Sequence, residues 1–270
     1  MMPMQQADDA RFLAHVRDAV RGAVQRGRPQ FVGFLDMHQA ALARTVRADD
    51  ARLIFWGGYD GAERVVLGVF PPVFAVRPHG RSYAAEATGA DPDAALRAAF
   101  PVVPLVLRCR ASVVLNHRDV LGTLMGLGIE RATVGDIRPE PGRCVCLVRR
   151  ELADHMAGQL RTVGREGVTV TVDEAAPVPA LHPPEERTDT VASPRADCVV
   201  AALARCGRST AATQIRAGLV QRNGVICTNV SEQLAAGDVL VIRKVGKFTI
   251  RAIGPQTRKG RLTLRVDVAR

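Results

Sequence analysis

The stretch IRAGLVQRNGVICT, residues 215–228, decides the fold of the last third of the chain. It continues a helical pattern whose apolar side includes Ala211 and Ile215, and Gly218 falls where a left-handed residue ends a helix. Asn223-Gly224 suits the positive backbone angles of a tight hairpin turn. The stretch therefore predicts the end of a helix, a short strand, a turn and a return strand.

The residues on both sides of this stretch extend it into a module that spans residues 195–270. Asp197 is a candidate N-cap for one helix, and Ser209 is a candidate N-cap for the helix that leads into residue 215. The apolar alternation then predicts strands at 219–221, 225–228, 239–244, 247–253 and 261–267. The module should be a small domain of two helices and a sheet.

The charge of the chain is concentrated in this module. Residues 1–190 carry 23 basic and 23 acidic side chains, whereas residues 191–270 carry 14 basic and four acidic ones. All of the formal net charge of +10 therefore belongs to the last 80 residues. A neutral body with a strongly cationic terminal module indicates a polyanion as the partner, and nucleic acid is the commonest polyanion.

The cationic side chains follow the predicted bends of the module. Arg208 begins the second helix, where free backbone N–H groups already favour a phosphate, and Arg222 and Asn223 stand at the hairpin tip. Helix start, helix side and hairpin tip are expected to form one cationic surface that reads folded RNA. The candidate RNA-binding residues are Arg195, Arg208, Ser209, Arg216, Gln221, Arg222, Asn223, Arg243, Lys244, Lys247, Arg258, Lys259 and Arg261.

The body upstream divides into smaller pieces. Residues 1–75 combine helical patterns with two β-rich runs joined by GGYDGAE, which predicts an N-terminal α/β domain. Residues 100–175 alternate strands and helices, as expected for helices packed on one sheet. Residues 176–194 hold five prolines and little to pack, so they are expected to be a linker. The predicted fold class is α+β with three small domains.

Composition also excludes several classes of protein. The six cysteines form no C-x-x-C pattern, and Cys144 and Cys146, two apart on a predicted strand, are read as buried residues and not as half of a metal site. Apolar runs are too short to span a bilayer, and the acidic N-terminus lacks a signal sequence, so a soluble cytoplasmic protein is expected. The module has a single aromatic residue, Phe248, which argues against recognition of single-stranded RNA by base stacking.

Two sets of motifs resemble known families. RADCVVAALARCGRSTAATQIRAGLVQRNGVICT and AAGDVLVIR, within residues 195–243, resemble the αL-motif RNA-binding domain of a small-subunit ribosomal protein, with Gly207 in place of the usual serine. LNHRDVLGTLMGLGIERATVGDI, FWGGYDGAER, KVGKFTI and GPQTRKGRLTLRV are similar to segments of the YlmH family, with Asn116 in place of a serine. Together these matches cover most of the chain.

The resemblance implies an N-terminal domain, a central domain like an RNA-recognition motif and a C-terminal αL-motif domain. It implies a non-enzymatic, ribosome-associated protein of translation that contacts ribosomal RNA and tRNA and takes part in rescue of stalled nascent chains on the large subunit. No cofactor, metal, small-molecule substrate or membrane is implied. His117 and Arg118 open a predicted helix capped by Asn116 and are secondary candidates for RNA contact.

Two other hypotheses remain open at the level of the sequence. αL-motif domains often direct pseudouridine synthases or methyltransferases to RNA, but the body shows neither a glycine-rich cofactor loop nor a synthase-like R-L-D segment. A division-associated or membrane-associated interaction protein would use the basic module on another partner. No basic amphipathic helix with bulky apolar residues supports the membrane version.

Overall fold

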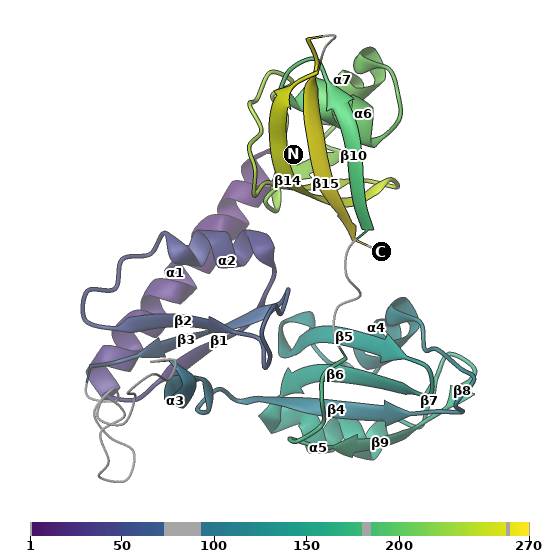
Figure 1. Ribbon diagram of the computed structural model, residues 1–270. Helices are drawn as coiled ribbons and strands as arrows, with labels where there is room; N and C mark the ends of the chain where they lie inside the picture. The colour runs from purple at the N-terminus through teal and green to yellow at the C-terminus, as the bar shows by residue number, and fades with distance from the viewer. Residues whose placement is uncertain (1, 73–92, 180–184, 258–259, 270) are drawn as a thin grey trace. The chain divides into compact units, whose positions relative to one another are not determined.

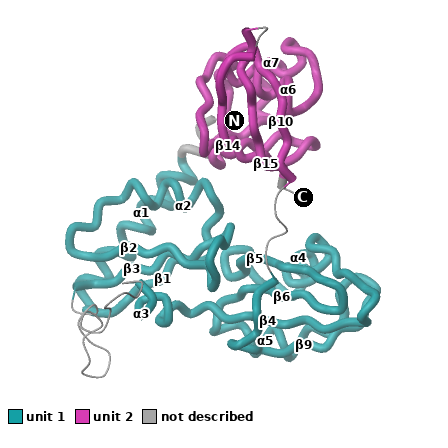
Figure 2. Tube along the Cα trace, viewed as in Figure 1, with its two compact units in different colours: residues 1–179 teal, residues 180–270 magenta. Residues whose placement is uncertain are grey.

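The computed structural model describes residues 2–72, 93–179, 185–257 and 260–269 (Figure 1). The chain is an α+β protein of two compact units, Met1–Pro179 and Ala180–Arg270, coloured separately in Figure 2. The first two expected domains therefore lie in a single unit, which we call unit 1. The basic module, preceded by a further strand, forms unit 2.

The N-terminal part of unit 1 is a three-stranded antiparallel sheet in the order β1-β3-β2, packed against two helices. Its elements are α1 (Met2–Arg26), β1 (Gln30–Leu35), α2 (Met37–Arg44), β2 (Arg52–Trp56) and β3 (Val65–Phe70). Val16 and Ala23 of α1 are fully buried against the sheet, as the helical spacing predicts. Asp36 and Gln39 form a capping box that starts α2.

The central part of unit 1 is a four-stranded antiparallel sheet in the order β5-β6-β4-β9. Helices α4 and α5 pack on one face, where Leu105, Leu124 and Met156 are fully buried. Asn116 caps α4, as predicted. The elements are α3 (Ala94–Arg97), β4 (Val102–Arg108), α4 (His117–Gly126), the 3-10 turn η1 (Arg131–Thr133), β5 (Val134–Glu140), β6 (Arg143–Arg149), α5 (Arg150–Gln159), β7 (Thr162–Val163), β8 (Glu166–Gly167) and β9 (Thr169–Val172).

The second face of the central sheet packs against the N-terminal sheet. Alternate residues of β4 and β6, among them Val106 and Leu147, are fully buried in one cluster with Phe34 and Phe70. Two glycines permit this approach: a Cβ on Gly33 would lie 2.5 Å from the carbonyl oxygen of Ala132, and a Cβ on Gly135 would lie 2.5 Å from the Phe34 ring. The second face is thus covered over β5, β6 and most of β4, whereas Arg108, Thr169 and Thr171 stay exposed.

Unit 2 combines two helices with a six-stranded antiparallel sheet in the order β10-β15-β14-β13-β11-β12. Val199, Leu203 and Ile215 of the helices are buried against Leu240 and Ile250 of the sheet. The elements are β10 (Glu185–Val191), α6 (Ala196–Leu203), α7 (Arg208–Arg216), β11 (Val220–Arg222), β12 (Val225–Ile226), β13 (Val239–Ile242), β14 (Gly246–Gln256) and β15 (Leu262–Ala269).

The expected linker at 176–194 is shorter than predicted. Residues Glu185–Val191 form β10, which pairs along its whole length with β15. The segment EERTDTV has a single apolar residue, Val191, which is buried. Arg187 and Asp189 share its side of the strand and are half-buried, whereas Thr188 and Thr190 on the other side are exposed. Arg187 fixes the strand further by donating hydrogen bonds to the carbonyl oxygens of Ala202 and Leu203 at the C-terminus of α6.

The quoted stretch folds as predicted. Asn223 and Gly224 have φ angles of 51° and 84°, and Arg222 pairs directly with Val225 across the turn. Gly218 has φ of 70° after the last turn of α7. The two predicted caps are wrong: Arg195 and Gly207 occupy the N-cap positions, and neither makes a side-chain cap hydrogen bond.

Candidate nucleic-acid interface

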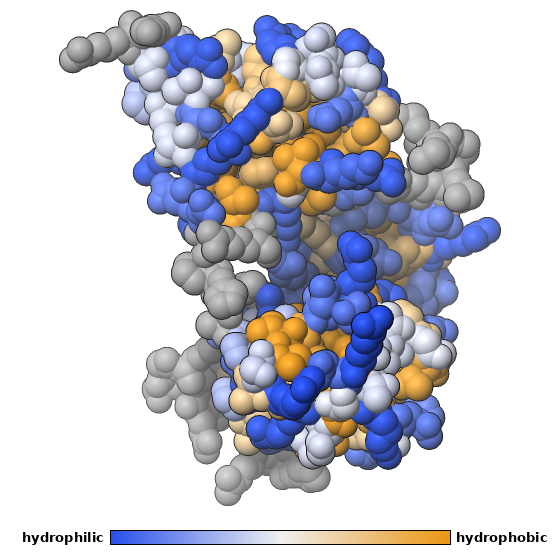
Figure 3. Space-filling model, turned by 90° about the vertical axis from the view of Figure 1, so that its right-hand side faces the viewer, coloured by the Kyte–Doolittle hydropathy of each residue, from blue (hydrophilic) through white to orange (hydrophobic). Residues whose placement is uncertain are grey.

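The acidic side chains of the basic module all pair with arginines of the same unit. Asp197 contacts Arg195 and Arg208, Glu232 and Asp238 contact Arg222, and Asp267 contacts Arg251. These are the four acids of residues 191–270, so the excess positive charge is left on the remaining basic side chains. Hydrophilic side chains cover much of the face drawn in Figure 3, with apolar patches between them.

Asp197 lies in the first turn of α6 and joins the starts of both helices. Its side chain is 8% exposed, and its carboxylate accepts hydrogen bonds from the guanidinium groups of Arg195 at 3.1 and 3.2 Å and of Arg208 at 2.7 Å. The hydrogen bond from Arg195, and after it that from Arg208, lowers the pKa of Asp197 well below its usual range. Arg208 remains 57% exposed, so it can still reach a phosphate at the start of α7.

Arg222 is placed differently from the sequence prediction. Its guanidinium is 26% exposed and turns toward Glu232 at 2.6 Å and Asp238 at 2.8 Å. Asn223 holds the same loop through its side chain: its Nδ2 donates to Asp238 Oδ1, and its Oδ1 accepts from the Val239 N–H. The tip of the hairpin is therefore an internally paired structure in which Arg222 has two carboxylates to neutralise its charge.

A second group of cations lies where α7 ends and β13 turns into β14. The Arg243 N–H donates to the carbonyl of Leu219 at 2.9 Å, which brings Arg243 and Lys244 beside the chain that follows Arg216. All three side chains are exposed, and among the residues that the structure describes none of them has a carboxylate partner. We call Arg216, Arg243 and Lys244 the open cationic group.

Lys244 has an unusual backbone conformation, with φ of +66°. A left-handed conformation costs a residue with a side chain roughly 1–2 kcal/mol, and glycine or asparagine normally occupies it. Strained positions of this kind concentrate at functional sites. The turn thus has a lysine at a position where the backbone conformation favours glycine.

The remaining predicted residues are scattered over unit 2. Ser209 and Gln221 are exposed, Lys247 is half-buried, and the guanidinium of Arg261 donates to the carbonyl of Thr190 on β10 at 2.6 Å. Arg258 and Lys259 lie outside the described residues. The sequence prediction omitted Arg205, an exposed residue with φ of 51° in the loop that leads to α7. Only its contribution to the net charge could have indicated it.

The single cationic surface predicted from the sequence is therefore divided. Arg195, Arg208 and Arg222 surround acidic residues near the starts of the helices and the hairpin tip. The open cationic group lies at the other end of α7. The two sets differ in charge balance, because the first is neutralised in part by Asp197, Glu232 and Asp238, whereas the second is not.

Unit 1 contains a different arginine-rich site, where the two sheets meet. Asp136 of β5 is 8% exposed and accepts hydrogen bonds from Tyr59 Oη at 2.5 Å, the Glu63 N–H at 2.8 Å and the Arg64 N–H at 3.0 Å. The guanidinium of Arg138 donates to the same Tyr59 oxygen. This network, which we call the Asp136 junction, ties the β2–β3 loop to the central sheet.

Half-buried arginine side chains complete the Asp136 junction. Arg64 donates to the carbonyl oxygens of Phe34 at 2.6 Å and Val134 at 3.2 Å. Burial, followed by the neighbouring Arg64, lowers the pKa of Arg131 to about 10, so that this group is still charged at neutral pH. The stretches FWGGYDGAER and RATVGDI, separate in sequence, thus meet in one structural contact.

The secondary candidates lie next to the Asp136 junction. His117 and Arg118 are exposed in the first turn of α4. Partial removal of the His117 ring from water, together with the nearby Arg131, lowers the pKa of His117 and so favours the neutral ring. A neutral imidazole can donate a hydrogen bond but adds no charge for a phosphate. Of this pair, only Arg118 supplies a positive charge at neutral pH.

Cys144 and Cys146 are buried on β6 with their sulfur atoms 4.0 Å apart. Within the described ranges, no group of three or more His, Cys, Asp and Glu side chains is arranged to hold a metal ion. Also within those ranges, no helix is long and apolar enough to cross a bilayer.

The fold and the charge distribution define an α+β protein whose C-terminal unit carries an excess of exposed basic side chains. Comparison with known proteins narrows this class. Residues 110–176 match the family model described as "Putative RNA-binding domain in YlmH". The chain is 29% identical over 255 residues to ribosome-associated protein quality control protein P2 of Bacillus subtilis (strain 168), covering 93% of this chain and 92% of that protein.

A solved structure, that of the cell division protein ylmH from Streptococcus pneumoniae, aligns with a TM-score of 0.48 and 16% identity over 62% of this chain and 91% of that one. The family model matches the central part of the chain, and the relative is similar over 93% of it. The chain is thus similar to proteins of the YlmH family.

Proposed function

We propose that this protein is a non-enzymatic RNA-binding factor of translation that binds structured ribosomal RNA and tRNA on the ribosome. The name of the Bacillus subtilis relative supports action in quality control of translation, and a role on the large subunit in rescue of stalled nascent chains fits that name. This function places the protein in the cytoplasm. Its partners are RNA and the ribosome, with no cofactor and no small-molecule substrate.

The observation that carries the proposal is the charge balance of unit 2. The four acids of residues 191–270 are held by arginines of the same unit, and the open cationic group has no carboxylate partner in the described part of the chain. Excess positive charge on one small unit destabilises it by self-repulsion, and a polyanion relieves that repulsion. Phosphates of RNA are the polyanion that the family-model match favours.

The proposal assigns a part to each region of the chain. Unit 2 is taken as the αL-motif RNA-binding domain, in which the open cationic group and Arg208 contact phosphates. The central part, residues 100–175, is taken as a domain like an RNA-recognition motif, and residues 1–75 as an N-terminal domain attached to it. Arg195, Arg222 and Asn223 are assigned to positioning of the binding surface, because the described contacts of their side chains are internal.

The test is the salt dependence of RNA binding by the full chain. The double variant Arg216→Gln/Arg243→Gln removes two cations that make no described ion pair. Each lost phosphate contact should reduce the slope of log K against log salt by about 0.7–0.9, so the slope should fall by roughly 1.5–2. Fluorescence anisotropy with labelled unfractionated tRNA, between about 50 and 200 mM KCl, measures it.

A matched control removes the same charge elsewhere in unit 2. Arg251 and Arg265 are exposed on β14 and β15, and Arg251 is paired with Asp267, so neither is assigned to the binding surface. Arg251→Gln/Arg265→Gln should therefore leave the slope near that of the wild type. An equal reduction of the slope in both double variants would mean that RNA binding depends only on the net charge of unit 2. An unchanged slope in Arg216→Gln/Arg243→Gln would refute the assignment of the open cationic group.

A further inference from the structure

The central sheet of unit 1 has little open face. Four-stranded sheets that recognise single-stranded RNA stack bases on aromatic side chains of an open face. Here helices α4 and α5 cover one face, and the N-terminal sheet covers part of the other with Phe34 and Phe70. The part of the second face at the end of β4 and along β9 is exposed, but it carries Arg108, Thr169 and Thr171 and no aromatic side chain.

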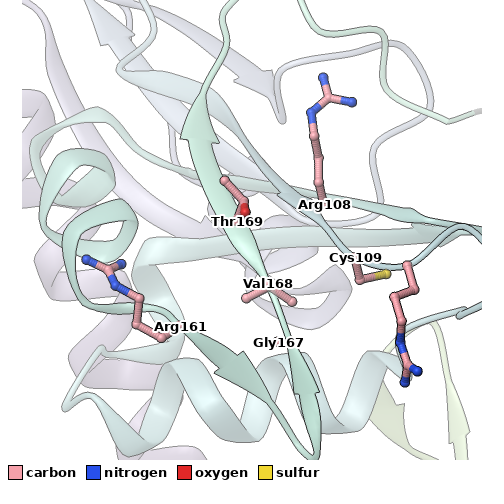
Figure 4. Close-up of a pocket in the computed structure, with 7 residues that line it drawn as sticks. Arg108, Cys109, Arg161, Gly167, Val168 and Thr169 are labelled. Carbon is pink, nitrogen blue, oxygen red and sulfur yellow. The ribbon is translucent and has the colours of Figure 1, made fainter.

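A hollow of about 450 Å³ lies at one end of the sheet, where β4 and the edge strand β9 meet (Figure 4). Three arginines from separate segments line it: Arg108 from the end of β4, Arg110 from the following loop and Arg161 from the turn after α5. Gly167, Val168 and Thr169 also line it. Residues 1–179 carry 22 basic and 20 acidic side chains, so this concentration of arginines is local.

The arginines of the hollow are only partly neutralised. Arg110 pairs with Glu166 at 2.7 Å but its side chain is 75% exposed. Arg161 donates to the carbonyl oxygens of Ala157 and Leu160 at the end of α5, and no carboxylate among the described residues pairs with it. Arg108 is exposed, and in the described part of the chain it has no carboxylate partner.

The position of Arg108 in the sheet is a second reason to expect an anion at this hollow. Arg108 lies directly opposite Arg143 in the pairing of β4 with β6. Like charges in directly opposed positions of an antiparallel pair are destabilising. Arg143 forms an ion pair with Glu140. Of the two opposed arginines, Arg108 is therefore the one whose charge an external anion would stabilise.

We infer that this hollow is a second RNA-backbone site of the protein, separate from unit 2. In Figure 4 the guanidinium groups of Arg108 and Arg161 diverge from the hollow and do not converge on one point. Diverging cations suit successive phosphates of an RNA strand that runs across the end of the sheet, and they do not suit one enclosed ion. The inference rests on the proposed RNA-binding function and adds to it a contact made by unit 1.

The test uses the full chain and labelled unfractionated tRNA. Arg108→Gln/Arg110→Gln should weaken binding roughly ten- to fiftyfold near 0.1 M salt and reduce the salt slope by roughly 1.5–2. Arg108→Lys/Arg110→Lys keeps both charges and should retain most of the slope. The control Arg17→Gln/Arg47→Gln removes two exposed arginines of the N-terminal part and should bind as the wild type does. The fluorescence of Trp56, the only tryptophan, checks that unit 1 is folded.

The outcomes separate this inference from the proposed function. If Arg108→Gln/Arg110→Gln binds normally while Arg216→Gln/Arg243→Gln is impaired, the second site is refuted and the function of unit 2 stands. If tRNA binding by the Arg108→Gln/Arg110→Gln variant is unchanged but its co-sedimentation with ribosomes is lost, the hollow contacts a protein and the inference is also refuted. Loss of affinity and slope in that variant, with rescue by the lysine variant, supports the site.

Discussion

Two arginine clusters of this protein, one in each unit, have opposite roles. At the Asp136 junction of unit 1, Arg64, Arg131 and Arg138 donate hydrogen bonds to backbone carbonyls, Tyr59 and Asp136. In the open cationic group of unit 2, Arg216 and Arg243 are exposed and have no described carboxylate partner. The comparison teaches that the number of arginines does not locate a binding surface, because the acceptors that surround each guanidinium decide its role.

The largest effect should come from the centre of the Asp136 junction. Asp136→Ala leaves a buried arginine, a tyrosine hydroxyl and two backbone N–H groups without their acceptor. We expect unit 1 to lose about 3–5 kcal/mol of its free energy of unfolding, as when one partner of a buried ion pair is removed. Urea denaturation followed by Trp56 fluorescence measures it. Asp154→Ala, at an exposed site on α5, is the control, and a loss below about 1 kcal/mol would show that the junction is not structural.

The second prediction contrasts two arginines only six residues apart. Arg222→Ala leaves Glu232 and the buried Asp238 without their cation, and should destabilise unit 2 by about 1.5–3 kcal/mol. Arg216→Ala should leave stability within about 0.5 kcal/mol of the wild type and weaken RNA binding. Hydrogen exchange of unit 2 and tRNA anisotropy test the pair. The distinction between paired and open arginines is wrong if Arg216→Ala destabilises unit 2 while Arg222→Ala weakens RNA binding without loss of stability.

The smallest effect is expected from Lys244→Gly, which should raise the stability of unit 2 but weaken RNA binding. Lys244→Gly relieves the positive φ angle and should stabilise unit 2 by up to about 1 kcal/mol, while the loss of the cation weakens RNA binding. The same hydrogen-exchange and anisotropy measurements apply. If Lys244→Gly is destabilising, the strain at this turn does not exist. If it binds RNA as the wild type does, Lys244 has no part in the interface.

Local patterns in the sequence predicted much of the fold. The helical spacing gave α1, α4 and α7, and Asn223-Gly224 gave the hairpin, because these elements follow from residues within one or two turns of one another. β10 was missed because its pairing with β15 spans more than 70 residues, and its polar side chains carry no local signal. β1 was missed for a similar reason: Gly33 interrupts its pattern and is needed for contact with Ala132, far along the chain.

The candidate site was predicted in composition but not in geometry. The net charge identified unit 2 as the basic part, and exposed Arg216, Arg243 and Lys244 agree with that prediction. The pairing of Arg222 with Glu232 and Asp238 could not be read from the sequence, because those acids approach through a long loop between β12 and β13. For the same reason the Asp136 junction, which joins residues more than 70 positions apart, was not anticipated.

The most direct test of the central claim is crosslinking of the protein to RNA in cells, followed by sequencing of the attached fragments. The wild type would be compared with Arg216→Gln/Arg243→Gln and with the control Arg251→Gln/Arg265→Gln. The account predicts reads concentrated on large-subunit ribosomal RNA and tRNA for the wild type and the control, and their loss in the Arg216→Gln/Arg243→Gln variant. Scattered reads in the wild type, or an unchanged pattern in that variant, would contradict it.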